Sequence, residues 1–174
     1  MTRTIIRSYD DHADAETAIT RLEAAGLPPE DISIIRSPTA SIENDAGRGA
    51  EVGGAVGAGA GLLAGLTALP LPGVGPVLAA GWLFGTLAVG TTAGAAAGSL
   101  IGALTGAGLS EDEAHFHAET IRRGSTVVSV RTSDSHAAVI EKILDGAGPI
   151  DADARRSEYE RAGWTRFDET KSPA

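Results

Sequence analysis

Cysteine is absent from this 174-residue chain, and lysine occurs only at Lys142 and Lys171. The lack of cysteine excludes disulfides, thiolate catalysis and cysteine-based metal centres. The formal net charge is −9, whereas phosphate binding needs clustered Lys and Arg side chains, so we expect no nucleic-acid partner. Aromatic residues make up 4% of the chain, and the core is therefore expected to consist of small and aliphatic side chains.

Charged residues are also missing from one long internal stretch, between Glu51 and Glu111, although both flanks have ordinary globular composition. The residues before Tyr9 include too few apolar side chains for a signal peptide, so we expect the chain on the cytoplasmic side. The shift in composition predicts four parts: a first α+β half at 1–48, a helical hairpin at 49–108, a second α+β half at 109–152, and a C-terminal helix and tail at 153–174.

Glycine recurs at every fourth position in two rows, the first of which begins just before the charge-free stretch. Residues four apart lie on one face of a helix, so each row would present a smooth groove to another helix backbone. Glycine costs about 1 kcal/mol relative to alanine in a helix interior, and close packing against a partner would offset that cost. The rows are Gly49, Gly53, Gly57, Gly61 and Gly65, then Gly90, Gly94, Gly98, Gly102 and Gly106.

A proline-rich break separates the two rows and is incompatible with a continuous helix. It predicts a tight reversal at Pro70, Pro72, Gly73, Gly75 and Pro76, and hence a hairpin of two glycine-zipper helices. The small residues would allow close contact between the two arms of one hairpin. They would equally allow close contact between hairpins of different chains, or between a hairpin and lipid. The spacing alone leaves these alternatives open.

The two flanks have matching patterns of strand, helix and strand. We expect that they assemble into one four-stranded antiparallel sheet with both helices on one face, the ferredoxin-like split βαβ arrangement, interrupted by the hairpin. The expected strands are residues 4–9, 31–35, 125–131 and 148–151, and the expected helices are 15–25 and 137–144.

Two further helices are predicted close to the second flank. Ser110 and Glu113 form a capping box at the start of a helix that runs to about residue 123. Residues 153–161 favour a short C-terminal helix, after which Trp164 and Phe167 are expected to pack back on the fold.

Several of these segments carry a family resemblance. Residues 24–27 (AAGL), 69–76 (LPLPGVGP), 113–115 (EAH) and 122–130 (RRGSTVVSV), in this order, resemble bacterial general-stress and low-temperature-induced proteins. The similarity extends over about residues 4–167 and includes a closing segment with Ile150, Asp151, Arg155, Gly163 and Trp164. Members of this glycine-zipper family have no assigned reaction, so the resemblance implies a stress-linked bacterial role and no catalytic residues.

One set of side chains has metal-ligand spacing: Glu111, His115 and Glu119 share a face of the capped helix. One helix cannot complete a coordination sphere, and a solvated face with i, i+4 pairs explains the same spacing. A phosphate-binding glycine loop is not expected, because no Gly-Lys-Ser or Gly-Lys-Thr occurs. We therefore predict no enzyme, no cofactor, no metal and no catalytic residue.

The charge-free stretch is long enough for two membrane spans, but its many glycines and alanines contribute little to insertion. We predict a non-enzymatic, stress-related protein that associates with itself through the hairpin, in or against the cytoplasmic membrane. The expected partners are other copies of the chain and membrane lipid. The alternative is a soluble, oligomeric ligand- or metal-binding sensor, in which the hairpin is a dimerisation element.

Overall fold

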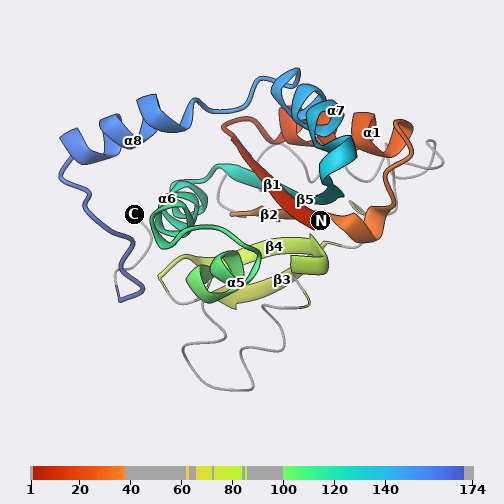
Figure 1. The fold of residues 1–174 in the computed structure, drawn as a ribbon. Coiled ribbons are helices and arrows are strands. Elements are labelled where there is room, and N and C mark those ends of the chain that lie inside the picture. Colours follow the sequence, from red (N-terminus) through yellow and green to blue (C-terminus); the bar gives the residue numbers. More distant parts are fainter. Residues whose placement is uncertain are drawn as a thin grey trace.

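The computed structural model describes residues 2–37, 62, 66–71, 73–83, 85 and 100–170. They form an α+β fold around a five-stranded antiparallel sheet in the order β1-β5-β2-β4-β3, with helices on both faces (Figure 1). The strands are β1 Thr2–Tyr9, β2 Ile32–Arg36, β3 Thr67–Leu71, β4 Gly75–Gly81 and β5 Thr126–Ser133. The helices are α1 His12–Ala24, the 3-10 helix η1 Pro29–Asp31, α5 Leu100–Gly106, α6 Glu111–Arg122, α7 Asp134–Asp145 and α8 Ala152–Arg161.

One half of the sheet consists of β1 at the edge, then β5 and β2, and the sequence predicts these three strands from their β-branched residues. Side chains alternate between the two faces of a strand, so β5 directs Val128 and Val130 to one face and Val127 to the other. Helices α1 and α7 cover the first face, and Figure 1 shows them side by side above the sheet. Their apolar stripes, which include Ile19 and Ile140, complete the core there.

The opposite face of the sheet is covered by α5 and α6. Leu104 of α5 and Ile121 of α6 pack with Val77 of β4 in a second core. The segment that follows α8 reaches the same side, where Trp164 joins an aromatic cluster and Phe167 joins this second core. The sheet therefore lies between two separate hydrophobic layers.

The sheet differs from the predicted one at both edges. It has five strands where four were expected, because β3 and β4 extend it beyond β2. The expected last strand at 148–151 is not a strand. One backbone hydrogen bond joins this segment to β1, from Ile150 N–H to the carbonyl of Ser8 (2.8 Å). The chain then turns into α8 at Asp151, whose carboxylate accepts from Ala154 N–H and favours a helix start over a longer strand.

The predicted helical hairpin at 49–108 is wrong in its centre, where β3 and β4 form a β-hairpin. The chain does reverse at the proline-glycine break, and both Gly73 and Gly75 have positive φ. Pro70 lies on β3 opposite Pro76. Because β3 is an edge strand, proline is tolerated at this position without the loss of a ladder hydrogen bond. The open edge of β2 explains the difference, because β4 satisfies backbone groups there that a helix would leave unpaired. Pro72 lies outside the described residues.

The helix predictions outside this region are confirmed. Ser110 caps α6, and the reciprocal capping box with Glu113 is complete. Helix α8 begins at Ala152 and ends at Arg161, and both Trp164 and Phe167 are buried. No helix in the described ranges combines the length and the apolar character that crossing a bilayer requires.

Candidate functional site

Two glycines of the second predicted row, Gly102 and Gly106, lie four residues apart on α5. A Cβ atom built on Gly106 would meet no other atom within 4 Å, so this end of the row borders open space in the described structure. The remaining row residues lie outside the described part: Gly49, Gly53, Gly57, Gly61, Gly65, Gly90, Gly94 and Gly98.

Two leucines that lie among the row glycines in the sequence are buried in the folded body. Leu62, within the first stretch, is buried in the core on the face of α1 and α7. Leu100, within the second row at the start of α5, is buried in the core on the opposite face. Leu62 and Leu100, one from each row, thus lie on opposite faces of the sheet.

The three metal candidates on α6 are held by arginine side chains. Arg166 donates through Nε to His115 Nε2 (2.6 Å) and pairs with Glu111. Burial, and then the positive charge of Arg166, lower the pKa of His115, so this imidazole is a neutral acceptor. Glu119 is paired instead with Arg122 and with Arg123.

Glu119 is the most deeply buried of the three candidates. Its side chain is 1% exposed, and its Oε1 accepts from Arg123 Nε at 2.7 Å. A buried carboxylate requires such partners because its desolvation is otherwise uncompensated. The three candidates therefore split into two separate ion-pair groups. In the described part of the chain, no three His, Asp or Glu side chains gather closely enough to hold a metal ion.

The second histidine of α6 faces the sheet. His117 is 9% exposed, and its Nδ1 lies 2.9 Å from Ser8 Oγ of β1. Desolvation lowers the pKa of His117 to about 4, although the carboxylate of Glu113 acts in the opposite direction. The imidazole is therefore neutral near pH 7. Within the described residues no hydrogen bond is made to its Nε2.

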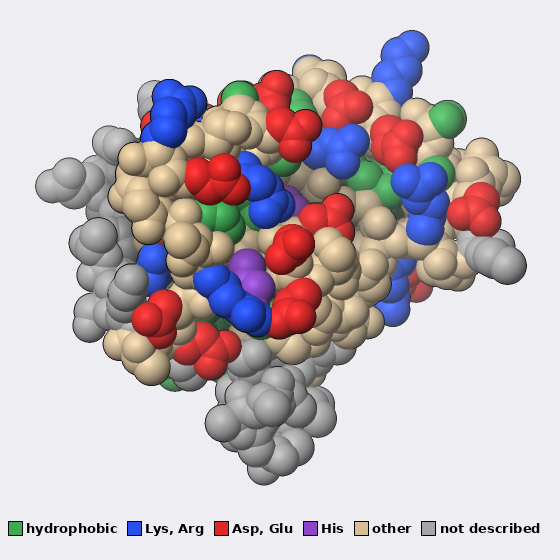
Figure 2. Space-filling view, turned by 60° about the vertical axis from the view of Figure 1, so that its left-hand side comes forward, with side chains coloured by type: hydrophobic (Ala, Val, Ile, Leu, Met, Phe, Trp, Pro, Cys, Tyr) green, Lys and Arg blue, Asp and Glu red, His purple; other side chains and the backbone are tan. Residues whose placement is uncertain are grey.

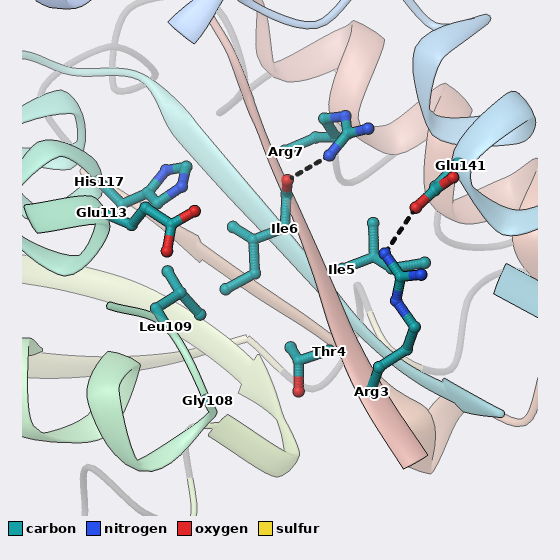
Figure 3. A pocket seen from close by; sticks show the side chains of 10 residues that line it. All are labelled: Arg3, Thr4, Ile5, Ile6, Arg7, Gly108, Leu109, Glu113, His117 and Glu141. Atoms are coloured by element: carbon teal, nitrogen blue, oxygen red, sulfur yellow. Dashed lines mark hydrogen bonds and ion pairs between the residues drawn. The ribbon is translucent and has the colours of Figure 1, made fainter. Parts of the chain in front are cut away.

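A groove of about 230 Å³ follows β1, which is an edge strand of the sheet. Its floor is formed by residues 3–7 of β1. The loop before α6 and the first turns of α6 provide one wall, with Leu109, Glu113 and His117, and Glu141 of α7 lies on the other side (Figure 3).

The two walls of the groove differ in charge. On the α7 side each acid has a partner, since Arg3 Nη2 donates to Glu141 Oε1 (2.8 Å) and Arg7 Nε donates to Asp145 Oδ1 (2.7 Å). On the α6 side, the Ser110 hydrogen bonds to Oε2 lower the pKa of Glu113 and keep it ionised. The α6 wall is thus acidic beside a neutral imidazole, whereas the α7 wall is balanced.

Figure 2 shows the face on which α6 and the C-terminal segment lie, with acidic and basic side chains intermixed. Histidine atoms are visible between them. No broad surface of one sign covers this face, as expected from the ion pairs of Arg166, Arg155 and Arg123.

The groove residues were not predicted as a site from the sequence. The spacing of Glu113 and His117 on one helix was a visible signal, because residues four apart share a face. The contact between His117 and Ser8 joins residues 109 positions apart, and only the packing of α6 on the sheet creates it.

The comparisons with known proteins leave the family open. None of the three comparisons, with protein families, with curated proteins and with solved structures, found a match to this chain.

Proposed function

We propose that this protein is a non-enzymatic, stress-linked module that associates with copies of itself through its glycine-rich stretches. The observation that supports the self-association is the open space beside Gly106 on α5. A glycine in a helix interior costs about 1 kcal/mol relative to alanine; Gly106, the last residue of α5, carries part of that cost, and no described residue fills the space beside it. A helix of a second copy, seated on the same glycine face, would offset it.

The side chains of α6 support a structural role for the best chemical candidates. Glu111 and His115 hold Arg166, and that contact fixes the segment after α8 on α6. Glu119 holds two arginines at the C-terminal end of the same helix, where positive charge also suits the helix dipole. We infer that these residues stabilise the fold and bind no metal.

Substitution of row glycines tests the self-association. Gly98→Leu places a bulky side chain in the second row, while Ala96→Leu adds similar volume about 200° away on the same predicted helix. We expect Gly98→Leu, and likewise Gly57→Leu in the first row, to reduce the oligomer to a smaller species in sedimentation velocity. Ala96→Leu should leave its size unchanged. An oligomer that keeps its size in both glycine variants would refute assembly through the rows.

Membrane association is a separate part of this proposal, and the charge-free composition from residue 52 to residue 110 supports it. Membranes from cells that contain the protein would be washed with alkaline carbonate. Retention in the pellet until detergent is added would support association through apolar residues. Recovery in the supernatant as a discrete oligomer would contradict it and leave assembly through protein contacts alone.

The second candidate function, a soluble ligand-binding domain, is favoured by the groove beside β1. Its frame would be the ferredoxin-like core that we propose for β1, α1, β2, β5 and α7. Support for that description comes from the neighbour order β1-β5-β2 and from the two helices on one face.

A further inference from the structure

The free edge of β1 offers backbone groups of defined position. In an antiparallel strand, successive residues direct their N–H and C=O groups alternately to the two sides. The carbonyl of Ser8 points away from β5, because it accepts from Ile150 N–H outside the sheet. Thr4 and Ile6, which share this parity, therefore also direct their backbone groups away from β5.

Part of this edge is already occupied. Ile150 closes the end at Ser8, and Arg7 Nη1 donates to the carbonyl of Ile6 (3.0 Å; Figure 3). Over the groove floor at residues 3–7, and within the described residues, the outward N–H and C=O of Thr4 and the N–H of Ile6 have no hydrogen-bond partner. This open length fits a segment of a few residues. The groove volume of about 230 Å³ also lies below the range of about 300–1,000 Å³ that is typical of small-molecule pockets.

The α6 wall indicates what the side chains of such a segment should carry. A strand that pairs with Thr4 directs the paired side chain to the same face as Thr4, which is the face of α6. Glu113 lies there with an ionised carboxylate, and the buried His117 faces the groove with its Nε2 unpaired among the described residues. A primary ammonium group donates to the carboxylate and, in the tautomer whose Nδ1–H donates to Ser8, also to the imidazole Nε2.

We propose that the groove beside β1 binds an extended segment of a partner protein that adds a short strand to the sheet edge and places a lysine side chain between Glu113 and His117. Backbone hydrogen bonds to Thr4 would give affinity, and the lysine contact would give specificity, as in other cases of strand addition. The net charge of −9 would also favour the approach of a basic partner.

A second copy of the chain fits the groove less well than a basic segment. Two antiparallel β1 strands related by a two-fold axis would share the same faces, so the uncharged Thr4 and Ile6 of the second copy would lie opposite Glu113. The arginines Arg3 and Arg7 of both copies would gather on the α7 face, where Glu141 and Asp145 already pair with them. Strand addition at β1 is thus independent of the glycine-based assembly proposed above.

A labelled peptide tests strand addition directly. The probe is the pentapeptide Thr-Val-Lys-Val-Thr, capped at both ends, with fluorescence anisotropy as the readout. We expect saturable binding to the full chain, weakened about tenfold or more when glutamate replaces the lysine. Methylation of the lysine backbone nitrogen, which removes the donor to Thr4, should weaken binding to a similar extent. Equal binding of the three peptides, or no saturable binding at millimolar protein, would overturn the proposal.

Matched protein variants locate the site. Thr4→Pro removes the outward N–H and is compatible with an edge strand, whereas Thr4→Val keeps the N–H. Glu113→Gln removes the charge but retains a side chain that completes a capping box. We expect Thr4→Pro and Glu113→Gln each to weaken binding of the lysine peptide about tenfold, and Thr4→Val to change it less than twofold. Equal binding of the lysine peptide by Thr4→Pro and Thr4→Val would overturn the proposal. A dimer of the wild-type chain that Thr4→Pro dissociates and Thr4→Val does not would also overturn it, because a second copy would then be the occupant of the groove. The methylated peptide keeps the test valid if Thr4→Pro fails to fold.

Discussion

The two faces of the sheet bury different kinds of side chain. On the face of α1 and α7 the core consists of aliphatic residues and alanine with Tyr9, and α7 buries only the stripe of Ala137, Ile140 and Leu144. On the other face α6 buries every residue from 114 to 121, including two histidines and a glutamate. The first face is explained by hydrophobic packing, while on the second the buried polar side chains also need partners, which His117 and Glu119 have.

The difference follows from what covers each helix. Helix α7 has solvent on its outer side, so an ordinary amphipathic stripe suffices. Helix α6 lies between the sheet and the C-terminal segment, which here means α8 and the residues up to 170. This segment contributes Tyr159 and Trp164 to a cluster with Phe116. Arg123 stacks over Tyr159 at 4.2 Å from the ring centroid, so ion pairs and aromatic contacts together cover its outer side. We infer that the C-terminal segment is necessary for the stability of α6 but not for that of α7.

The largest expected effect is on the aliphatic face. Ile19 is fully buried there, and Ile19→Ala should lower the free energy of unfolding by about 4 kcal/mol through lost burial and a cavity. Because no ionisable group is involved in this loss, it should be the same at pH 5 and pH 7. Urea denaturation at both pH values measures it. A loss that changes strongly with pH would show that this face is coupled to the polar one.

The next effect concerns the buried carboxylate on the polar face. Glu119→Gln leaves Arg122 and Arg123 without their acid, and we expect a loss of about 3 kcal/mol. Glu141→Gln, which breaks the exposed pair with Arg3, is the control and should cost less than about 1 kcal/mol. Similar losses in the two variants, measured by urea denaturation, would show that burial does not distinguish the two ion pairs.

The third effect is a pH dependence. The pKa of His117 is about 4 in the folded chain, whereas that of an unperturbed imidazole, as in the unfolded chain, is 6.5. Between these values the unfolded chain binds a proton that the folded chain does not, so the free energy of unfolding falls as the pH falls through this window. At pH 5 the loss relative to pH 7 should be about 2 kcal/mol from His117. The lowered pKa of His115 acts in the same direction.

Comparison with His117→Gln isolates the contribution of this residue. Glutamine retains a polar group that can bond to Ser8, but it does not titrate. We expect the variant to lose less stability than the wild type between pH 7 and pH 5, as measured by denaturation at each pH. Parallel curves for the two proteins would contradict the burial of a neutral His117.

The smallest expected effect is at the glycine row. Gly106→Ala adds a methyl group into open space at the end of α5 and should stabilise an isolated copy by about 0.5–1 kcal/mol. In an assembly that packs on this glycine, the same change should weaken association. Thermal unfolding at low concentration and sedimentation at high concentration separate the two results. A stabilised copy with unchanged association would exclude Gly106 from the contact.

The sequence predicted the elements whose signals lie close together in the chain. The capping box of Ser110 and Glu113, the apolar stripes of α1 and α7 and the β-branched run of β5 each need only neighbouring residues. The assignment of the candidate site was less complete. Sequence spacing suggested Glu111, His115 and Glu119 as one group. In the structure Arg166, more than forty positions further along the chain, binds the first two, whereas Glu119 pairs with Arg123.

The sequence by itself determined the absence of cysteine chemistry, the acidic balance, and the helices and strands with local start and stop signals. Tertiary structure decided that residues 67–81 pair as strands, because the open edge of β2 supplies hydrogen-bond partners that no local pattern encodes. It also decided that His117 is neutral and faces a groove, because desolvation depends on the sheet that packs against α6. Local interactions can be inferred from spacing, whereas burial and strand pairing exist only in the assembled fold.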